Sequence, residues 1–122
     1  MSMPAPEHTF SKEERICGKS AIALLMDKGH WGSTSCIRYC YMEGQSDRSR
    51  IMVSVPKRHF KRAVRRNLLK RRIREAYRLN KDLLSDARAD IMLVYTQAQI
   101  LPFAEIEADV KSILKKIEAR AK

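Results

Sequence analysis

The residues with the clearest chemical potential are basic side chains gathered in one stretch of the chain. Of the 25 Lys and Arg residues in this 122-residue sequence, eleven lie between Pro56 and Arg78, where Glu75 is the only acidic residue. That window therefore holds +10 of the formal net charge of +11. A concentrated positive field attracts polyanions, whereas the same charge spread evenly would chiefly aid solubility. The sequence predicts an anion-binding surface here.

The spacing within this window is helical. The segment from Lys61 to Leu79 lacks Gly and Pro and is rich in Arg, Lys, Leu and Ala, which favour helices. At about 100° per residue, its apolar and its polar side chains fall on opposite faces. The apolar face holds Leu69, Ile73, Ala76 and Tyr77, and the opposite face holds Asn67, Lys70, Arg71, Arg74 and Arg78. We expect one face in the core and a cationic face in solvent.

The cationic face favours RNA as its partner. Like-charged pairs four residues apart, such as Lys70 with Arg74, each cost about 0.2–0.5 kcal/mol in an isolated helix, and a bound polyanion relieves that cost. Arg outnumbers Lys in the helix, and guanidinium groups bind phosphate bidentately, which favours nucleic acid over a lipid surface. The face has few polar side chains suited to reading base edges, which favours structured RNA over DNA.

Hydrophobic periodicity predicts the elements that position this helix. A Ser-x-x-Glu capping box at Ser11 to Glu14 and a stop at Gly29 place a first helix within residues 12–28. Alternating residues predict strands at 34–42 and 50–55, joined as a hairpin by a polar turn. A buried strand at 90–95 and an amphipathic helix at 104–121 complete an α+β domain over residues 9–122, preceded by a flexible arm at 1–8.

Other chemistries receive little support from the composition. The three cysteines and three histidines are scattered, with neither a CxxC pair nor a metal-ligand spacing, so we expect free thiols and no zinc site; they are Cys17, Cys36, Cys40, His8, His30 and His59. No run of about 18 apolar residues and no signal-peptide pattern occurs. We therefore expect a cytoplasmic protein without a membrane partner.

The residues of the basic helix resemble a known family. The run Ala-Val-Arg-Arg-Asn-Leu-Leu-Lys-Arg-Arg-Ile-Arg-Glu-Ala-Tyr-Arg, from Ala63 to Arg78, resembles the A-V-x-R-N-R-x-K-R-x-x-R-E signature of bacterial ribonuclease P protein subunits. The preceding segment, Val53 to Arg58, is similar to the family's V-S-x-x-K segment. The resemblance implies a small single domain like the second domain of ribosomal S5 proteins. Its central mixed sheet would have about four strands, with the basic helix in an unusual left-handed βαβ crossover and a helix near each terminus.

The resemblance also implies an activity in which RNA is the catalyst. In this family the RNA subunit positions magnesium ions that activate water to cleave precursor tRNA at its mature 5′ end. The protein supports the RNA fold and contacts the 5′ leader in a cleft between the first helix and the sheet. The implied partners are the ribonuclease P RNA, in a 1:1 complex, and precursor tRNA. The magnesium would be held mainly by RNA, and no protein residue would be catalytic.

Carried over by position, the resemblance assigns site residues. The expected RNA-binding residues are Lys57, Arg58, Lys61, Arg62, Arg65, Arg66, Asn67, Lys70, Arg71, Arg74 and Arg78. The expected leader-cleft residues are Ile22, Met26, Val53, Val55 and Lys57. The sequence departs from the family pattern in three ways: Leu68 replaces the motif's second arginine, Lys61 replaces a glycine, and Ile22 and Met26 stand where aromatic residues are usual.

Two other functions compete with this interpretation. In a protein-only nuclease, His30 and His59 would act as acid and base on a phosphodiester. In a ribosomal-type protein, the same basic helix would bind structured RNA without any catalytic partner. The first requires the two histidines to lie close together, and the second requires that the chain fail to stimulate a ribonuclease P RNA.

Overall fold

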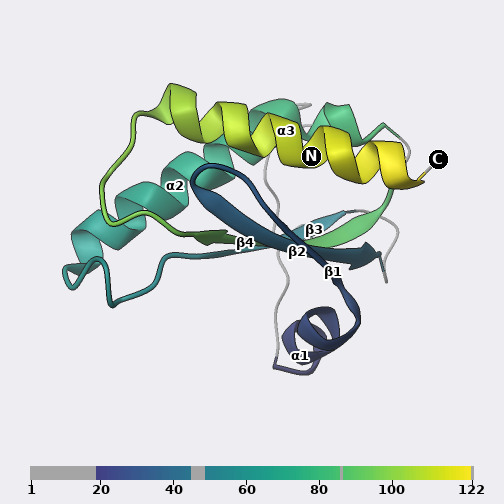
Figure 1. The fold of residues 1–122 in the computed structure, drawn as a ribbon, viewed down its shortest axis with the longest axis horizontal. Helices are drawn as coiled ribbons and strands as arrows, with labels where there is room; N and C mark the ends of the chain where they lie inside the picture. Colours follow the sequence, from purple (N-terminus) through teal and green to yellow (C-terminus); the bar gives the residue numbers. More distant parts are fainter. Residues whose placement is uncertain (1–18, 45–48, 86, 122) are drawn as a thin grey trace, which may run out of the picture.

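The computed structural model describes residues 19–44, 49–85 and 87–121. Within these ranges, three helices and four strands form one layered α+β arrangement, together with a short 3-10 helix, η2 (Figure 1). In chain order they are α1 (Lys19–Lys28), β1 (His30–Ser33), β2 (Ile37–Glu43), β3 (Arg50–Ser54), α2 (Ala63–Asn80), η2 (Lys81–Leu84), β4 (Ala89–Tyr95) and α3 (Phe103–Ala121). The expected arm at 1–8 and capping box at Ser11 to Glu14 lie outside the described residues.

The four strands form a mixed sheet in the order β1-β2-β4-β3. The β1–β2 and β2–β4 pairs are antiparallel, whereas β3 and β4 are parallel, with Ile51 opposite Ile91 and Val53 opposite Leu93. Parallel neighbours need a crossover connection, and α2 supplies it. The expected four-stranded mixed sheet with the basic helix in a βαβ unit is confirmed.

One predicted pairing is wrong. The strands predicted at 34–42 and 50–55 do not form a hairpin, because β4 inserts between them and pairs with both. The hairpin partner of β2 is β1, a strand that the sequence did not predict. Three of the four β1 residues are exposed, so this short edge strand lacks the alternation of polar and apolar residues that reveals a strand.

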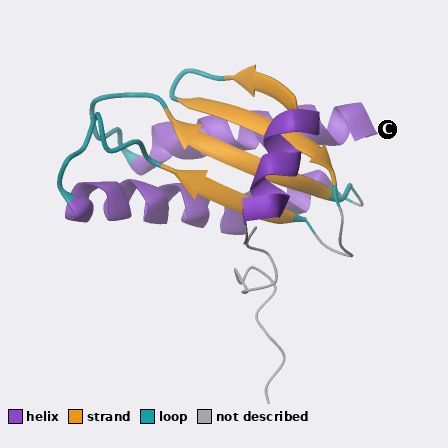
Figure 2. Ribbon diagram, turned by 90° about the horizontal axis from the view of Figure 1, so that it is seen from below, coloured by secondary structure: helices purple, strands orange, loops and turns teal. Residues whose placement is uncertain are grey.

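Helices cover both faces of the sheet, but unequally. The helices α2 and α3 pack on one face and enclose the larger core, which includes Ile37, Leu69, Ile73 and Ile113. On the other face, α1 buries Leu25 against Cys40 and Met92. Figure 2 shows α1 crossing the near face, with the two long helices behind the sheet. Within the described ranges, no helix is both long and apolar enough to cross a membrane.

The two described cysteines are free and buried, one on each face of the sheet. Burial, together with the Asp109 carboxylate, raises the pKa of Cys36 to about 12. Burial also raises the pKa of Cys40, whose thiol donates to the Leu25 carbonyl at 3.3 Å. The thiolate is the reactive form of cysteine. Both side chains are therefore protected from alkylation and oxidation, because they are buried and because their raised pKa values keep them protonated.

We expect Cys36 and Cys40 to resist iodoacetamide at pH 8 until the protein unfolds. The rate at each position, followed by mass spectrometry of the peptides, should rise by orders of magnitude in urea. The pKa of Cys36 is higher in the folded protein than in the unfolded chain, so its contribution to the free energy of unfolding is complete at pH values below the unfolded pKa. That contribution is lost as the pH rises from the unfolded pKa through the folded value of about 12. Rapid labelling of Cys36 in the native protein would contradict its placement in the core.

Candidate nucleic-acid interface

Helix α2 presents the two faces that its sequence predicts. Leu69, Ile73, Ala76 and Tyr77 are each at most 1% exposed and belong to the core under the sheet. A helix turns about 100° per residue, so Asn67, Arg71 and Arg74 lie on the side away from this stripe. Asn67 and Arg71 are exposed, and Arg74 is half-buried. Core packing therefore orients the polar face toward solvent.

Two arginines anchor α2 to neighbouring loops. The Arg66 Nη1 donates to the carbonyls of Phe60, at 2.7 Å, and Lys61, at 2.9 Å, which holds the loop that enters the helix. The Arg72 Nη1 donates to the Leu101 carbonyl at 2.5 Å, in the loop that precedes α3. Arg66 was predicted to bind RNA, and the structure gives its guanidinium a positioning role in the loop of basic residues.

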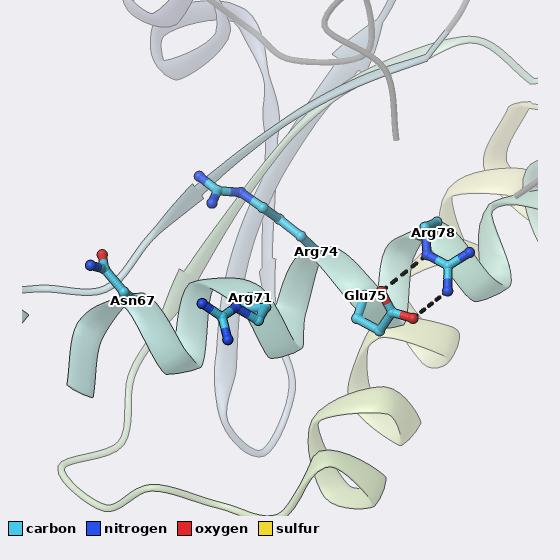
Figure 3. A pocket seen from close by; sticks show the side chains of 5 residues that line it. All are labelled: Asn67, Arg71, Arg74, Glu75 and Arg78. Carbon is cyan, nitrogen blue, oxygen red and sulfur yellow. Dashed lines mark hydrogen bonds and ion pairs between the residues drawn. The ribbon is translucent and has the colours of Figure 1, made fainter. Parts of the chain in front are cut away.

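Four of the predicted residues meet around one hollow on α2. It has a volume of about 330 Å³ and is lined by Asn67, Arg71, Arg74, Glu75 and Arg78. Figure 3 shows the guanidinium groups of Arg71 and Arg74 separated along the helix, with Asn67 toward its N-terminal end. An amide and guanidinium groups are donors suited to phosphate oxygens. The hollow can therefore accept anionic groups.

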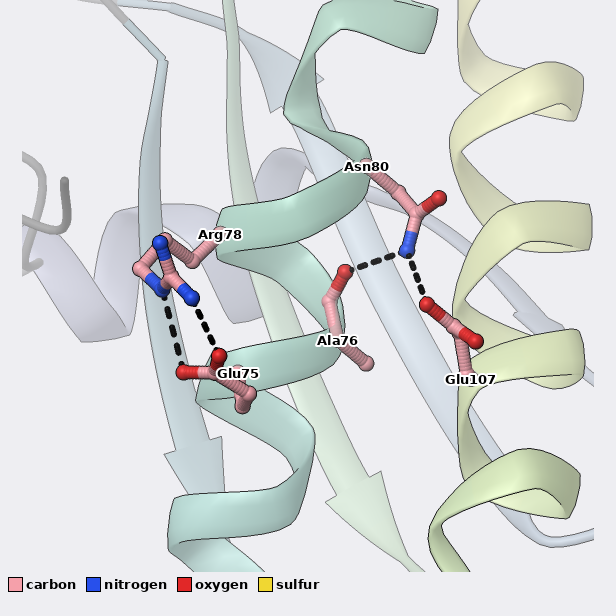
Figure 4. Close-up of polar contacts among 5 residues, drawn as sticks. All are labelled: Glu75, Ala76, Arg78, Asn80 and Glu107. Atoms are coloured by element: carbon pink, nitrogen blue, oxygen red, sulfur yellow. Dashed lines mark hydrogen bonds and ion pairs between the residues drawn. The ribbon is translucent and has the colours of Figure 1, made fainter. Parts of the chain in front are cut away.

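Glu75 and Arg78 line the C-terminal part of this hollow and form an ion pair. The Arg78 Nε donates to Glu75 Oε2 at 3.0 Å, and Arg78 Nη2 donates to the other carboxylate oxygen. These hydrogen bonds lower the pKa of Glu75 and raise that of Arg78. Figure 4 shows this pair on one side of α2 and, on the side facing α3, Asn80, whose amide donates to the Ala76 carbonyl and to Glu107. One edge of the Arg78 fork is thus already occupied by a carboxylate.

The other predicted RNA-binding residues surround the N-terminal half of α2. Lys57, Arg58, Lys61, Arg62 and Arg65 are exposed, and Lys70 is half-buried. None of these six lines the hollow. Arg65 lies two residues before Asn67, which is a rotation of about 200° around the helix axis. It therefore extends from the side of α2 opposite to Asn67. Leu68, which replaces the motif arginine, is half-buried.

The predicted leader cleft is only partly assembled. Ile22 packs on the α1 side of the sheet and Met26 is 49% exposed on α1. Val53 and Val55 instead lie in the larger core with α2 and α3, on the opposite face, so the prediction that they share a cleft with α1 is wrong. Side chains alternate along a strand, and it is Met52 that packs on the α1 side. Lys57 is exposed in the turn beyond β3.

The structure separates the two histidines of the nuclease hypothesis. His30 begins β1 and His59 follows β3, and these strands are the opposite edges of the sheet. Three strand spacings separate the edges, a distance of about 14 Å. An acid and a base must both lie within hydrogen-bond reach of the reacting atoms, so His30 and His59 cannot serve one phosphodiester.

Trp31 and Arg38 are exposed residues that no motif pointed to. The Arg38 Cζ lies 4.5 Å from the centroid of the Trp31 ring, and 41% of Trp31 is exposed. The available signal was modest: Trp31 is the chain's single tryptophan, and it stands beside a glycine in a segment without strand periodicity.

Comparison with known proteins identifies the family. The family model for ribonuclease P matches residues 10–118. The chain belongs to the ribonuclease P protein family. A ribonuclease P protein component from Porphyromonas gingivalis is 40% identical over 103 residues, which cover 80% of this chain and 73% of the relative. Residues 10–118, which the family model matches, include the whole of α2 and the residues that line its hollow.

Solved ribonuclease P proteins share the fold. The Staphylococcus aureus ribonuclease P protein superposes with a TM-score of 0.74 and 26% identity, covering 84% of this chain and 94% of that one. The Thermotoga maritima protein has a TM-score of 0.75 over 85% of this chain and 97% of that one, and its 24% identity supports the fold alone. The small α+β domain expected from the sequence is therefore confirmed as the fold of this family.

Proposed function

We propose that this chain is the protein subunit of a ribonuclease P and binds the catalytic RNA through the polar face of α2. The observation that supports the proposal best is the hollow of Asn67, Arg71 and Arg74 on a helix whose opposite face is locked in the core. A rigid row of phosphate donors suits a folded RNA backbone recognised by shape. In a 1:1 complex, this face would hold the RNA subunit.

The second part of the proposal concerns the substrate. We propose that the α1 side of the sheet contacts the 5′ leader of precursor tRNA, and so promotes its removal by the RNA subunit. Ile22 and Met26 supply apolar contacts there, and the exposed Lys57 adds a positive charge beyond β3. Single-stranded RNA binds through contacts to its base faces together with attraction to its phosphates, and this set of side chains supports that mode.

The third part of the proposal assigns the magnesium ions of the reaction to the RNA subunit. No three His, Cys, Asp or Glu side chains group as ligands within the described ranges. The carboxylates of Asp90 and Glu75 are each engaged by an arginine, at Arg50 and Arg78 respectively. We propose that the magnesium needed for cleavage is coordinated by RNA, and that the protein contributes binding and positioning in the cytoplasm.

Reconstitution with a bacterial ribonuclease P RNA tests the proposal. At low magnesium, where the RNA alone is slow, the protein should increase 5′ cleavage of precursor tRNA at least tenfold, an effect of about 1.4 kcal/mol on the barrier. RNA alone and protein alone are the controls. Tight RNA binding without any gain in cleavage would favour the ribosomal-type alternative. Cleavage by the protein without RNA would support a protein nuclease and refute the proposal.

Replacing Glu75 with Gln should tighten binding to the RNA subunit about threefold at low salt, because it removes a negative charge beside the phosphates and weakens the hydrogen bonds that Arg78 donates to residue 75. The salt dependence should steepen by about one ion. The pKa of Glu75 is lowered in the folded protein, so the Glu75–Arg78 ion pair of the wild-type protein persists at neutral pH. The pair is lost only as the pH falls through this lowered pKa.

A matched control distinguishes this local effect from a change in net charge. Glu105 is an exposed carboxylate in the first turn of α3, outside the hollow. Glu105→Gln changes the net charge equally and should leave affinity almost unchanged. Equal tightening by both variants in filter-binding titrations would show that Glu75 acts only through net charge.

A further inference from the structure

The described residues cover the sheet face beneath α1 only in part. Two rows of side chains cross this face, as the strand register defines them: Trp31, Cys40, Met92 and Met52 in the first, and Ser33, Arg38, Val94 and Ser54 in the second. Packing of α1 buries Cys40 and Met92 in the middle of the first row. Trp31 and Arg38, nearer the β1 edge, stay exposed.

Trp31 and Arg38 form a pair that holds the indole ring in a defined position. They are diagonal neighbours on two antiparallel strands, because Trp31 is opposite Cys40 and Ser33 is opposite Arg38. The guanidinium carbon lies 4.5 Å from the ring centroid, well within the range of a cation–π contact. Arg38 takes part in no ion pair with a carboxylate of the described residues. Its positive charge therefore remains available to a ligand.

An exposed indole beside a guanidinium has the two features needed to hold an unpaired nucleobase. The flat aromatic and guanidinium surfaces stack on bases, and the cation attracts the adjoining phosphate. A duplex keeps its base faces covered, so only single-stranded RNA can use such a surface. We propose that Trp31 and Arg38 form a stacking site for one unpaired base of a single-stranded RNA segment. This inference rests on the proposed function in that the chain must bind RNA.

The charge of the surroundings favours RNA over a protein partner at this position. An apolar protein surface that covered Trp31 would also remove Arg38 from water without giving its charge a partner, which is costly. A nucleotide covers the ring and supplies a phosphate for the guanidinium together. The net charge of +11 further favours a polyanionic ligand.

The single tryptophan makes the test direct, because all tryptophan fluorescence of the full chain arises from Trp31. Titration with a short oligoadenylate at low salt should quench this fluorescence in parallel with binding measured by anisotropy of the labelled oligonucleotide. An RNA duplex of equal length should quench it far less. Oligonucleotide binding without a fluorescence change would place the base elsewhere and overturn the proposal.

Variants separate stacking from general loss of structure. Trp31→Leu should weaken oligoadenylate binding about tenfold, whereas Trp31→Phe should retain most of it. Arg38→Ala keeps the fluorophore and should reduce both affinity and quenching. Leu79→Ala is the matched control, since Leu79 is 42% exposed, on α2. All variants should unfold at wild-type urea concentrations.

The outcomes also separate this inference from the proposed function. Wild-type binding to ribonuclease P RNA, combined with unchanged oligoadenylate affinity in Trp31→Leu, would overturn the stacking site alone. Stimulation of leader cleavage would then still stand. Failure of the wild-type chain to bind either RNA would refute both. If a protein changed the Trp31 fluorescence on binding and oligoadenylate did not, Trp31 would be a protein contact, and the proposal would also be overturned.

Discussion

Reversing both Arg71 and Arg74 to Glu is expected to weaken binding to the ribonuclease P RNA about 100-fold or more. Hydrogen bonds to charged groups contribute roughly 1.5–3 kcal/mol each, and the introduced carboxylates would repel the phosphates that the arginines attract. Both side chains line the hollow on α2. The slope of log affinity against log salt should fall by about one for each lost contact.

The control for this prediction is a pair of reversals on the other long helix. Lys115 and Lys116 are exposed on α3, and their replacement by Glu changes the net charge by the same amount. That double variant should lose much less affinity. Circular dichroism and urea unfolding should show that both variants fold, because neither pair belongs to the core. Equal losses would mean that the RNA responds to total charge and that α2 is no specific interface.

Replacing Asp90 with Ala is expected to lower the free energy of unfolding by about 3 kcal/mol. Asp90 is 4% exposed and receives two hydrogen bonds from Arg50, from Nε at 3.0 Å and from Nη2 at 2.6 Å. The pair joins the first residues of the parallel β3–β4 ladder. Removing the carboxylate leaves a partly buried guanidinium without this partner, so the cost exceeds that of a surface ion pair.

A double-mutant cycle isolates this pair. Urea unfolding of Asp90→Ala, Arg50→Ala and the double variant should show that the double variant loses clearly less than the sum of the single losses. A domain of this size has a total stability of about 5–15 kcal/mol, so the single Asp90 variant should also unfold at a visibly lower temperature. Strict additivity would indicate that the two residues stabilise the sheet independently.

The basic helix was predictable because its signal is local. The faces of α2 follow from a fixed rotation per residue, and Leu69, Ile73, Ala76 and Tyr77 are buried as that rotation requires. The predicted helix from 61 to 79 and the observed one, Ala63–Asn80, agree to within two residues at the start and one at the end. Concentrated charge, helical spacing and the family motif all depend on neighbours in the chain.

The errors arose where distant segments meet. Alternation along β3 separates Val53 from Met52, but it does not say which side α1 covers, so the predicted cleft took residues from the wrong face. Likewise, strands close in sequence were predicted to pair, although the sheet places β4 between β2 and β3. The Trp31–Arg38 pair became visible only when β1 was placed beside β2.

The sequence alone determined that this chain carries a cationic helix with an apolar underside, an α+β composition and the motif of its family. Tertiary structure decided which basic residues share the hollow, which arginines are engaged by Glu75 or by loop carbonyls, and which sheet face remains open beside α1. The physical reason is that periodicity and charge act over a few residues. Strand order and face coverage are instead set by packing between segments far apart in the chain.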